Sequence, residues 1–119
     1  MRLFFAALTL LVGLQVSAGE IDQPAALSAL QAPETLLIDV RTAEEFAAGA
    51  LPGAARIGHE QIAAQIATLA PEKDTVIVLY CRSGRRSSIA QDSLQALGYR
   101  NVINAGGYEQ LEAELEAQD

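Results

Sequence analysis

The 119-residue chain has one cysteine, one histidine, one methionine and no tryptophan. A single cysteine cannot close an internal disulfide, and one cysteine with one histidine cannot supply the ligand sets that protein metal sites ordinarily use. The chain also lacks a glycine-rich loop of the nucleotide-binding type. These shortages predict a protein without a metal and without a cofactor.

Positive charge is scarce as well. Eight Lys and Arg residues stand against fifteen Asp and Glu residues, which gives a formal net charge of −7. Nucleic acids and anionic membranes bind to broad basic surfaces, so we do not expect an acidic chain of this kind to bind either.

The N-terminus resembles a secretory signal peptide. An apolar run from Leu3 to Leu14 follows a basic start, and small residues lead to an expected cleavage after Ala18. The run is shorter than the roughly 20 apolar residues that a membrane span requires, and an uncleaved anchor is the alternative interpretation. Cleavage divides the chain into a signal peptide, 1–18, and one domain, 19–119, which is long enough to bury its own core. We therefore expect an exported monomer without stable membrane association, located in the periplasm if the source is a Gram-negative bacterium.

Apolar runs with strand character alternate with segments of helical period. The expected strands are 35–40, 55–57, 76–80 and 99–103, and the expected helices are 19–32, 42–48, 60–69, 86–97 and 108–115. Asp22 is the expected N-cap of the first helix, and Thr42 with Glu45 has the spacing of a capping box. Gly106-Gly107 is expected to form a turn. The alternation predicts an α/β domain with a parallel sheet covered on both faces.

The only cysteine follows a β-branched apolar run, Val76 to Tyr80, and precedes a glycine-containing loop and a helical pattern. Cys81 is therefore expected at the carboxyl end of a buried strand, where ligands bind in open α/β sheets. Three of the eight basic residues, Arg82, Arg85 and Arg86, come within the next five positions. Positive charge, loop amides and a helix N-terminus lower the pKa of a thiol from its ordinary value of about 8.5. We expect a reactive, partly exposed thiolate that meets an anion.

Three motifs, in order along the chain, resemble those of the single-domain rhodaneses, a family of sulfurtransferases. The first motif is Asp39-Val40-Arg41, followed by Glu45-Phe46, Gly49 and Pro52-Gly53-Ala54. The second is Cys81-Arg82-Ser83-Gly84-Arg85-Arg86, which is similar to the family's Cys-x-x-Gly-x-Arg loop. The third is Gly106-Gly107-Tyr108. The resemblance covers about Leu36 to Leu111. The chain departs from the family pattern at Ala50, where histidine is common, and at Leu111, where an aromatic residue is common.

The resemblance implies a rhodanese-like three-layer domain with a central, mostly parallel sheet flanked by helices. It also implies a thiosulfate sulfurtransferase, whose thiolate takes the outer sulfur of a small anionic donor, holds it as a persulfide and passes it to cyanide or a thiol. Cys81 would be the catalytic nucleophile. The substrate-binding residues would be Arg82, Ser83, Gly84, Arg85 and Arg86. The mercaptopyruvate branch of the family has Gly and Thr where this chain has Arg82 and Arg86, so thiosulfate is the expected donor.

Asp39 and Arg41 are interpreted as supporting residues, either an ion pair or a loop brace at the end of a strand. We also hypothesise that Asp39 orients Arg86. His59 is expected to be exposed or to cap a helix, because the sequence suggests no partner for it.

Two other classes of function are open at this point. A cysteine phosphatase or arsenate reductase needs an arginine after the cysteine and five further residues, but Ser87 holds that position and Arg86 comes one residue too early. A persulfide carrier or interaction domain, which delivers sulfur or a redox signal to an exported partner, needs the same thiolate as the enzyme. The sequence favours the enzyme, with the carrier as the alternative.

Overall fold

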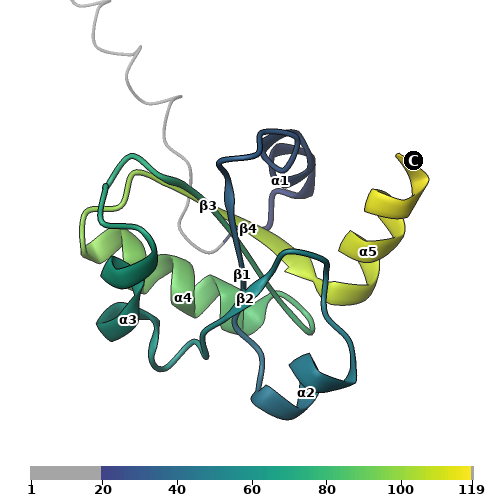
Figure 1. Cartoon of the computed structure of the whole chain (residues 1–119), viewed down its shortest axis with the longest axis horizontal. Coiled ribbons are helices and arrows are strands. Elements are labelled where there is room, and N and C mark those ends of the chain that lie inside the picture. The colour runs from purple at the N-terminus through teal and green to yellow at the C-terminus, as the bar shows by residue number, and fades with distance from the viewer. Residues whose placement is uncertain (1–19, 119) are drawn as a thin grey trace, which may run out of the picture.

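Strands and helices alternate throughout residues 20–118, the part of the chain that the computed structural model describes (Figure 1). The expected signal peptide, 1–18, lies outside these residues. The elements are α1 (Gln23–Ala29), β1 (Leu36–Asp39), α2 (Ala43–Ala48), β2 (Ala55–Arg56), α3 (Ile62–Leu69), β3 (Val76–Cys81), α4 (Arg85–Ala96), β4 (Asn101–Gly107) and α5 (Tyr108–Ala117). Within residues 20–118, no helix combines the length and the apolar character needed to cross a membrane.

The four strands form one parallel sheet in the order β2-β1-β3-β4, which confirms the predicted α/β class. β3 lies between β1 and β4, so its backbone is paired on both sides. The register between β3 and β4 shifts between Leu79 and Cys81, and Cys81 lies opposite Gly107. Because all the strands run in one direction, their carboxyl ends meet at a single edge of the sheet, and Cys81 lies at that edge.

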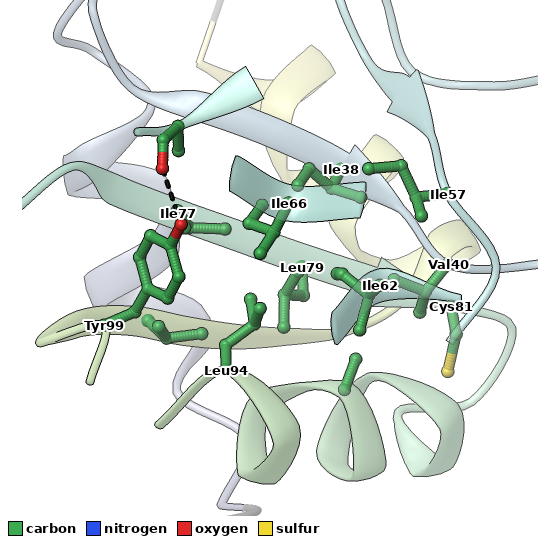
Figure 2. Close-up of a cluster of buried hydrophobic side chains, with 13 residues drawn as sticks. Ile38, Val40, Ile57, Ile62, Ile66, Ile77, Leu79, Cys81, Leu94 and Tyr99 are labelled. Atoms are coloured by element: carbon green, nitrogen blue, oxygen red, sulfur yellow. Dashed lines mark hydrogen bonds between the residues drawn. The ribbon is translucent and has the colours of Figure 1, made fainter. Parts of the chain in front are cut away.

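Helices cover both faces of the sheet (Figure 1). On the face covered by α3 and α4, the buried cluster in Figure 2 includes Ile38 and Ile77, with Cys81 at one end and Tyr99 at the other. The Tyr99 hydroxyl donates a hydrogen bond of 2.6 Å to the Ala70 carbonyl, so this buried polar group is satisfied. The buried cluster on the other face consists of Ala26, Leu37, Leu51, Val78, Tyr80, Ala105 and Leu111. Cys81 thus continues the apolar core to the edge of the sheet.

Side-chain caps begin the first two helices as the sequence predicted. The Asp22 carboxylate accepts a hydrogen bond of 3.1 Å from the Ala25 N–H at the start of α1. At α2, the Thr42 hydroxyl accepts from the Glu45 N–H at 3.1 Å, and the Glu45 carboxylate accepts from the Thr42 N–H at 3.0 Å. This reciprocal pair is the expected capping box, and it fixes Glu45 near the carboxyl edge of the sheet.

Two expected boundaries are wrong. Helix α1 begins at Gln23, as the Asp22 N-cap predicts, but it ends at Ala29 and does not continue to Ala32. Ile21, before the cap, pairs with Asn104 of β4 in an isolated parallel bridge. Gly106-Gly107 is not a separate turn, since β4 runs to Gly107 and leads directly into α5. Gly106 has a φ of +89°, a left-handed conformation that glycine adopts readily, and it bends the strand end without a loop.

Ile66 of α3 belongs to the buried core on the α3 and α4 face. Replacing Ile66, which is 1 % exposed, with Ala should lower the free energy of unfolding by about 2–5 kcal/mol, because it removes apolar contacts and leaves a cavity. Leu69→Ala is the matched control on the same helix, since Leu69 is 43 % exposed. Urea unfolding measures both variants, and equal destabilisation by the two substitutions would contradict the assigned core face.

Candidate active site

A loop of three residues turns the chain back from β3 into α4. Arg82, Ser83 and Gly84 follow Cys81, and α4 begins at Arg85. Gly84 has a φ of +101°, and a β-carbon at this position would lie 2.6 Å from the Ile21 side chain. The loop therefore favours glycine for its backbone conformation, and a side chain at this position would also displace the end of the Ile21 side chain.

Hydrogen bonds from this loop and from α4 reach the Cys81 sulfur. The Gly84 N–H donates to Sγ at 2.9 Å, and the Ser87 hydroxyl lies 3.5 Å from Sγ. Burial raises the pKa of the Cys81 thiol, but hydrogen bonds from the Ser87 hydroxyl and from the backbone N–H groups of Ser87, Gly84 and Ser83 lower it. The net effect holds the pKa below its ordinary value, as the sequence predicted, because these donors stabilise the thiolate.

The exposure of the cysteine differs from the prediction. We expected a partly exposed thiol, but Cys81 is 0 % exposed and belongs to the apolar cluster with Val40 and Ile57. The reason is that the Arg82–Gly84 loop folds over the strand end, with the Gly84 N–H directed at the sulfur. A reagent therefore reaches the sulfur only after atoms that cover it move.

A buried asparagine on β4 holds the donors of the sulfur in place, and the sequence interpretation missed it. The Asn104 Oδ1 lies 2.7 Å from the Ser87 hydroxyl oxygen, whose single proton points either to Oδ1 or to the Cys81 sulfur; Oδ1 also accepts from the Gly106 N–H at 2.9 Å, while Nδ2 donates to the Gly84 carbonyl at 3.3 Å. Asn104 is 0 % exposed. The signal in the sequence was a single polar residue inside an apolar strand, just before the two glycines.

Asp39 and Arg41 form the ion pair that the sequence suggested. Their closest approach is 2.7 Å, both side chains are buried, and a second Arg41 nitrogen also bonds to the carboxylate. The Arg41 guanidinium donates to the Gly49 carbonyl at 2.6 Å and lies over the Tyr108 ring, 4.4 Å from its centroid. The pair joins the end of β1 to the end of α2 and the start of α5.

The hypothesis that Asp39 orients Arg86 is wrong. Asp39 is engaged by Arg41, and Arg86 instead binds Glu45, with N–O distances of 2.8 and 3.2 Å. The hydrogen bonds from Arg86 and from Thr42 lower the pKa of Glu45 to about 2. Glu45 reaches Arg86 because the capping box turns its side chain back toward the start of α2.

The other two arginines that follow Cys81, Arg82 in the loop and Arg85 at the start of α4, are exposed. Arg82 and Arg85 have no ion-pair partner within residues 20–118. Arg82 borders a cleft of about 470 Å³ that is also lined by Arg41, Glu45, Ala48, Gly49, Tyr108, Glu109 and Gln110. This cleft carries charges of both signs beside the cysteine loop.

His59 lies away from that cleft. It is half-buried and lines a smaller hollow of about 170 Å³ together with Arg56 and Arg86. Within the described part of the chain, no group of three or more His, Cys, Asp and Glu residues could hold a metal ion.

Comparison with known proteins decides the family. The family model described as the rhodanese-like domain matches residues 22–114, which include all the elements up to α5. The chain belongs to the rhodanese family. Its activity is therefore that of a sulfurtransferase.

Individual rhodaneses resemble the chain over most of its described length. The thiosulfate sulfurtransferase PspE of Escherichia coli is 36 % identical over 74 residues, 62 % of this chain and 71 % of that protein. The human thiosulfate:glutathione sulfurtransferase is 35 % identical over 108 residues, 79 % of this chain and 94 % of that protein. Among solved structures, an Escherichia coli rhodanese with anions is 36 % identical with a TM-score of 0.62. This match covers 63 % of the present chain and 88 % of the Escherichia coli chain. The human single-domain sulfurtransferase TSTD1 is 28 % identical with a TM-score of 0.66, and the match covers 82 % of this chain and 97 % of the TSTD1 chain.

Removal of the Ser87 hydroxyl should raise the pKa of Cys81, because a donor to the thiolate is lost. In Ser87→Ala, the pH at which iodoacetamide alkylation reaches half its maximal rate should move upward. Ser93→Ala is the control, since that hydroxyl bonds to the Ile89 carbonyl within α4. An unchanged profile in Ser87→Ala would show that the backbone amides alone set the pKa.

Glu45 should stabilise the fold only while it is ionised. Its pKa of about 2 in the folded chain is below the ordinary value of 4.5, so its contribution is complete above about pH 4.5 and is lost as the pH falls toward 2. The difference in urea midpoint between the wild type and Glu45→Gln should therefore shrink over this range. Glu44→Gln controls for the loss of one carboxylate on the same helix. A Glu45→Gln difference that stays constant down to pH 2 would contradict the assigned ion pair.

Proposed function

We propose that this rhodanese moves the sulfane sulfur of thiosulfate through a persulfide on Cys81 to a thiophilic acceptor, cyanide or a thiol. The observation that carries the proposal is the Gly84 N–H at 2.9 Å from the sulfur of a thiol whose pKa is lowered, with three arginines in the five residues that follow Cys81. The name of the Escherichia coli relative, thiosulfate sulfurtransferase, supports the same donor.

In the first half-reaction, the Cys81 thiolate attacks the outer sulfur of thiosulfate. A bond forms between Sγ and that sulfur, the original sulfur–sulfur bond breaks, and sulfite leaves with the electron pair. The outer sulfur keeps the negative charge that it carried in thiosulfate, and the charge of the thiolate leaves with sulfite, so no net charge is created. No separate base is required, because the hydrogen bonds to Sγ already favour the ionised thiol.

In the second half-reaction, the acceptor attacks the outer sulfur of the persulfide. Cyanide leaves as thiocyanate, and the electron pair of the broken bond restores the Cys81 thiolate. A thiolate acceptor would leave as a persulfide by the same displacement. The human relative named thiosulfate:glutathione sulfurtransferase supports a thiol as one such acceptor.

The arginines divide into donor-binding and supporting groups in this proposal. Arg82 and Arg85 are exposed beside the loop and would attract the dianionic donor. Loop backbone amides, including those of Ser83 and Gly84, would stabilise charge on the bound sulfur. Arg41, paired with Asp39, would brace the end of β1 and leave the donor to the loop residues.

We also propose that residues 1–18 are a signal peptide and that the mature domain, 19–119, acts as an exported monomer without stable membrane association. In a Gram-negative bacterium this location would be the periplasm. The apolar run at the N-terminus and the acidic charge of the chain support the proposal.

The intact mass of the mature protein after exposure to thiosulfate tests the chemistry. The wild type should gain one sulfur atom, and the gain should disappear on addition of cyanide with formation of thiocyanate. Cys81→Ser should gain nothing, because the nucleophile is gone. A saturable steady-state rate distinguishes an enzyme from a persulfide carrier, which would be loaded without efficient turnover. No mass gain on a wild-type thiol that iodoacetamide still alkylates would rule out thiosulfate as the donor.

A further inference from the structure

Arg86, on the first turn of α4, already forms an ion pair with a carboxylate, that of Glu45. The Glu45 carboxylate accepts hydrogen bonds from both terminal nitrogens of Arg86, at 2.8 and 3.2 Å. The Arg86 side chain is 25 % exposed and the Glu45 side chain is 26 % exposed. Arg86 holds the final position of the Cys-x-x-Gly-x-Arg pattern. An anionic donor that approaches Arg86 therefore meets a guanidinium whose charge is partly neutralised.

Glu45 is also fixed in place. Its Oε1 accepts from the Thr42 N–H at 3.0 Å and from the Thr42 hydroxyl at 3.2 Å, in addition to the bond from Arg86. Its pKa of about 2 keeps it negative at every pH at which the Cys81 thiolate is present. The carboxylate thus remains ionised and held by α2 when a donor arrives.

The position of Glu45 relative to the cleft makes its charge relevant to the donor. Glu45 lines the same 470 Å³ cleft as Arg82 and Arg41, beside the cysteine loop. Because Coulomb repulsion is proportional to the charge of each partner, a dianion in this cleft is repelled about twice as strongly as a monoanion of similar size.

We propose that Glu45 is a specificity-determining residue that shares Arg86 with the donor and reduces the preference for dianionic over monoanionic sulfur donors. The proposal rests on the function proposed above, because it concerns the donor site of the same reaction. Glu45 acts partly through Arg86 and partly through its own charge, and it takes no part in the transfer of sulfur.

Glu45→Gln tests the proposal with little disturbance of the fold, because glutamine also satisfies a capping box. The donors are thiosulfate, a dianion that releases sulfite, and methanethiosulfonate, a monoanion that releases methanesulfinate. In Glu45→Gln, kcat/KM for thiosulfate should rise about two- to fivefold, mainly through KM, as expected for the loss of one partly exposed charge interaction. The rise for methanethiosulfonate should be smaller.

Two matched variants separate charge from structure. Glu44→Gln removes the neighbouring exposed carboxylate of α2 and should leave the ratio of the two donors unchanged. Glu45→Asp keeps the negative charge on a shorter side chain and should retain the wild-type ratio. If Glu45→Gln proved too unstable to assay, a raised ratio in Glu45→Asp would still contradict the proposal.

A second measurement does not depend on turnover. Unreactive sulfate and methanesulfonate, a dianion and a monoanion, are compared for their protection of Cys81 against iodoacetamide. Glu45→Gln should improve the protection by sulfate more than that by methanesulfonate. If the wild type failed to use thiosulfate, the proposed function would fall, while this comparison would still decide the role of Glu45.

Two outcomes would overturn the proposal. A lower kcat/KM for thiosulfate in Glu45→Gln would mean that Glu45 aims Arg86 at the donor and does not compete with it. Equal changes for dianions and monoanions would mean that Glu45 acts on the structure of the loop and not on the charge of the ligand.

Discussion

The chemistry at the carboxyl edge of the sheet depends on the hydrogen bond from the Gly84 N–H to the Cys81 sulfur. The bond forms because three residues turn the chain from β3 into α4, and Gly84 accepts the left-handed conformation that so short a turn imposes. Asn104 and Ser87 then hold the far side of the turn. Loss of this geometry would leave the thiol buried without its closest donor, and burial alone raises its pKa.

The two ion pairs near this turn differ in how far they are buried. The Asp39–Arg41 pair is buried and joins three elements, so breaking it would leave an uncompensated charge in the core. The Glu45–Arg86 pair is partly exposed, and water screens it, so its rearrangement costs little. The first pair therefore suits a permanent brace, whereas the second suits an electrostatic adjustment of ligand binding.

Much of the fold was predictable because its signals are local. Alternating strand and helix patterns gave the parallel sheet, and the Thr42–Glu45 spacing gave the cap of α2. The partner of Arg86 was not predictable, because nothing local distinguishes Asp39 from Glu45 as the nearer carboxylate. The burial of Cys81 and the role of Asn104 likewise depend on contacts between β3, α4 and β4, and sequence spacing does not report such contacts.

A sulfur that is 0 % exposed reacts only during the fraction of time that the atoms covering it have moved aside and the site is open. When opening and closing are fast, the observed rate with any reagent is the opening equilibrium constant multiplied by the intrinsic rate, as in hydrogen exchange. The opening factor is common to all reagents that enter through the same opening, so it cancels when two such donors are compared. Burial of Cys81 thus limits how often the thiolate meets any reagent, whereas the charged groups around it act on each anion differently.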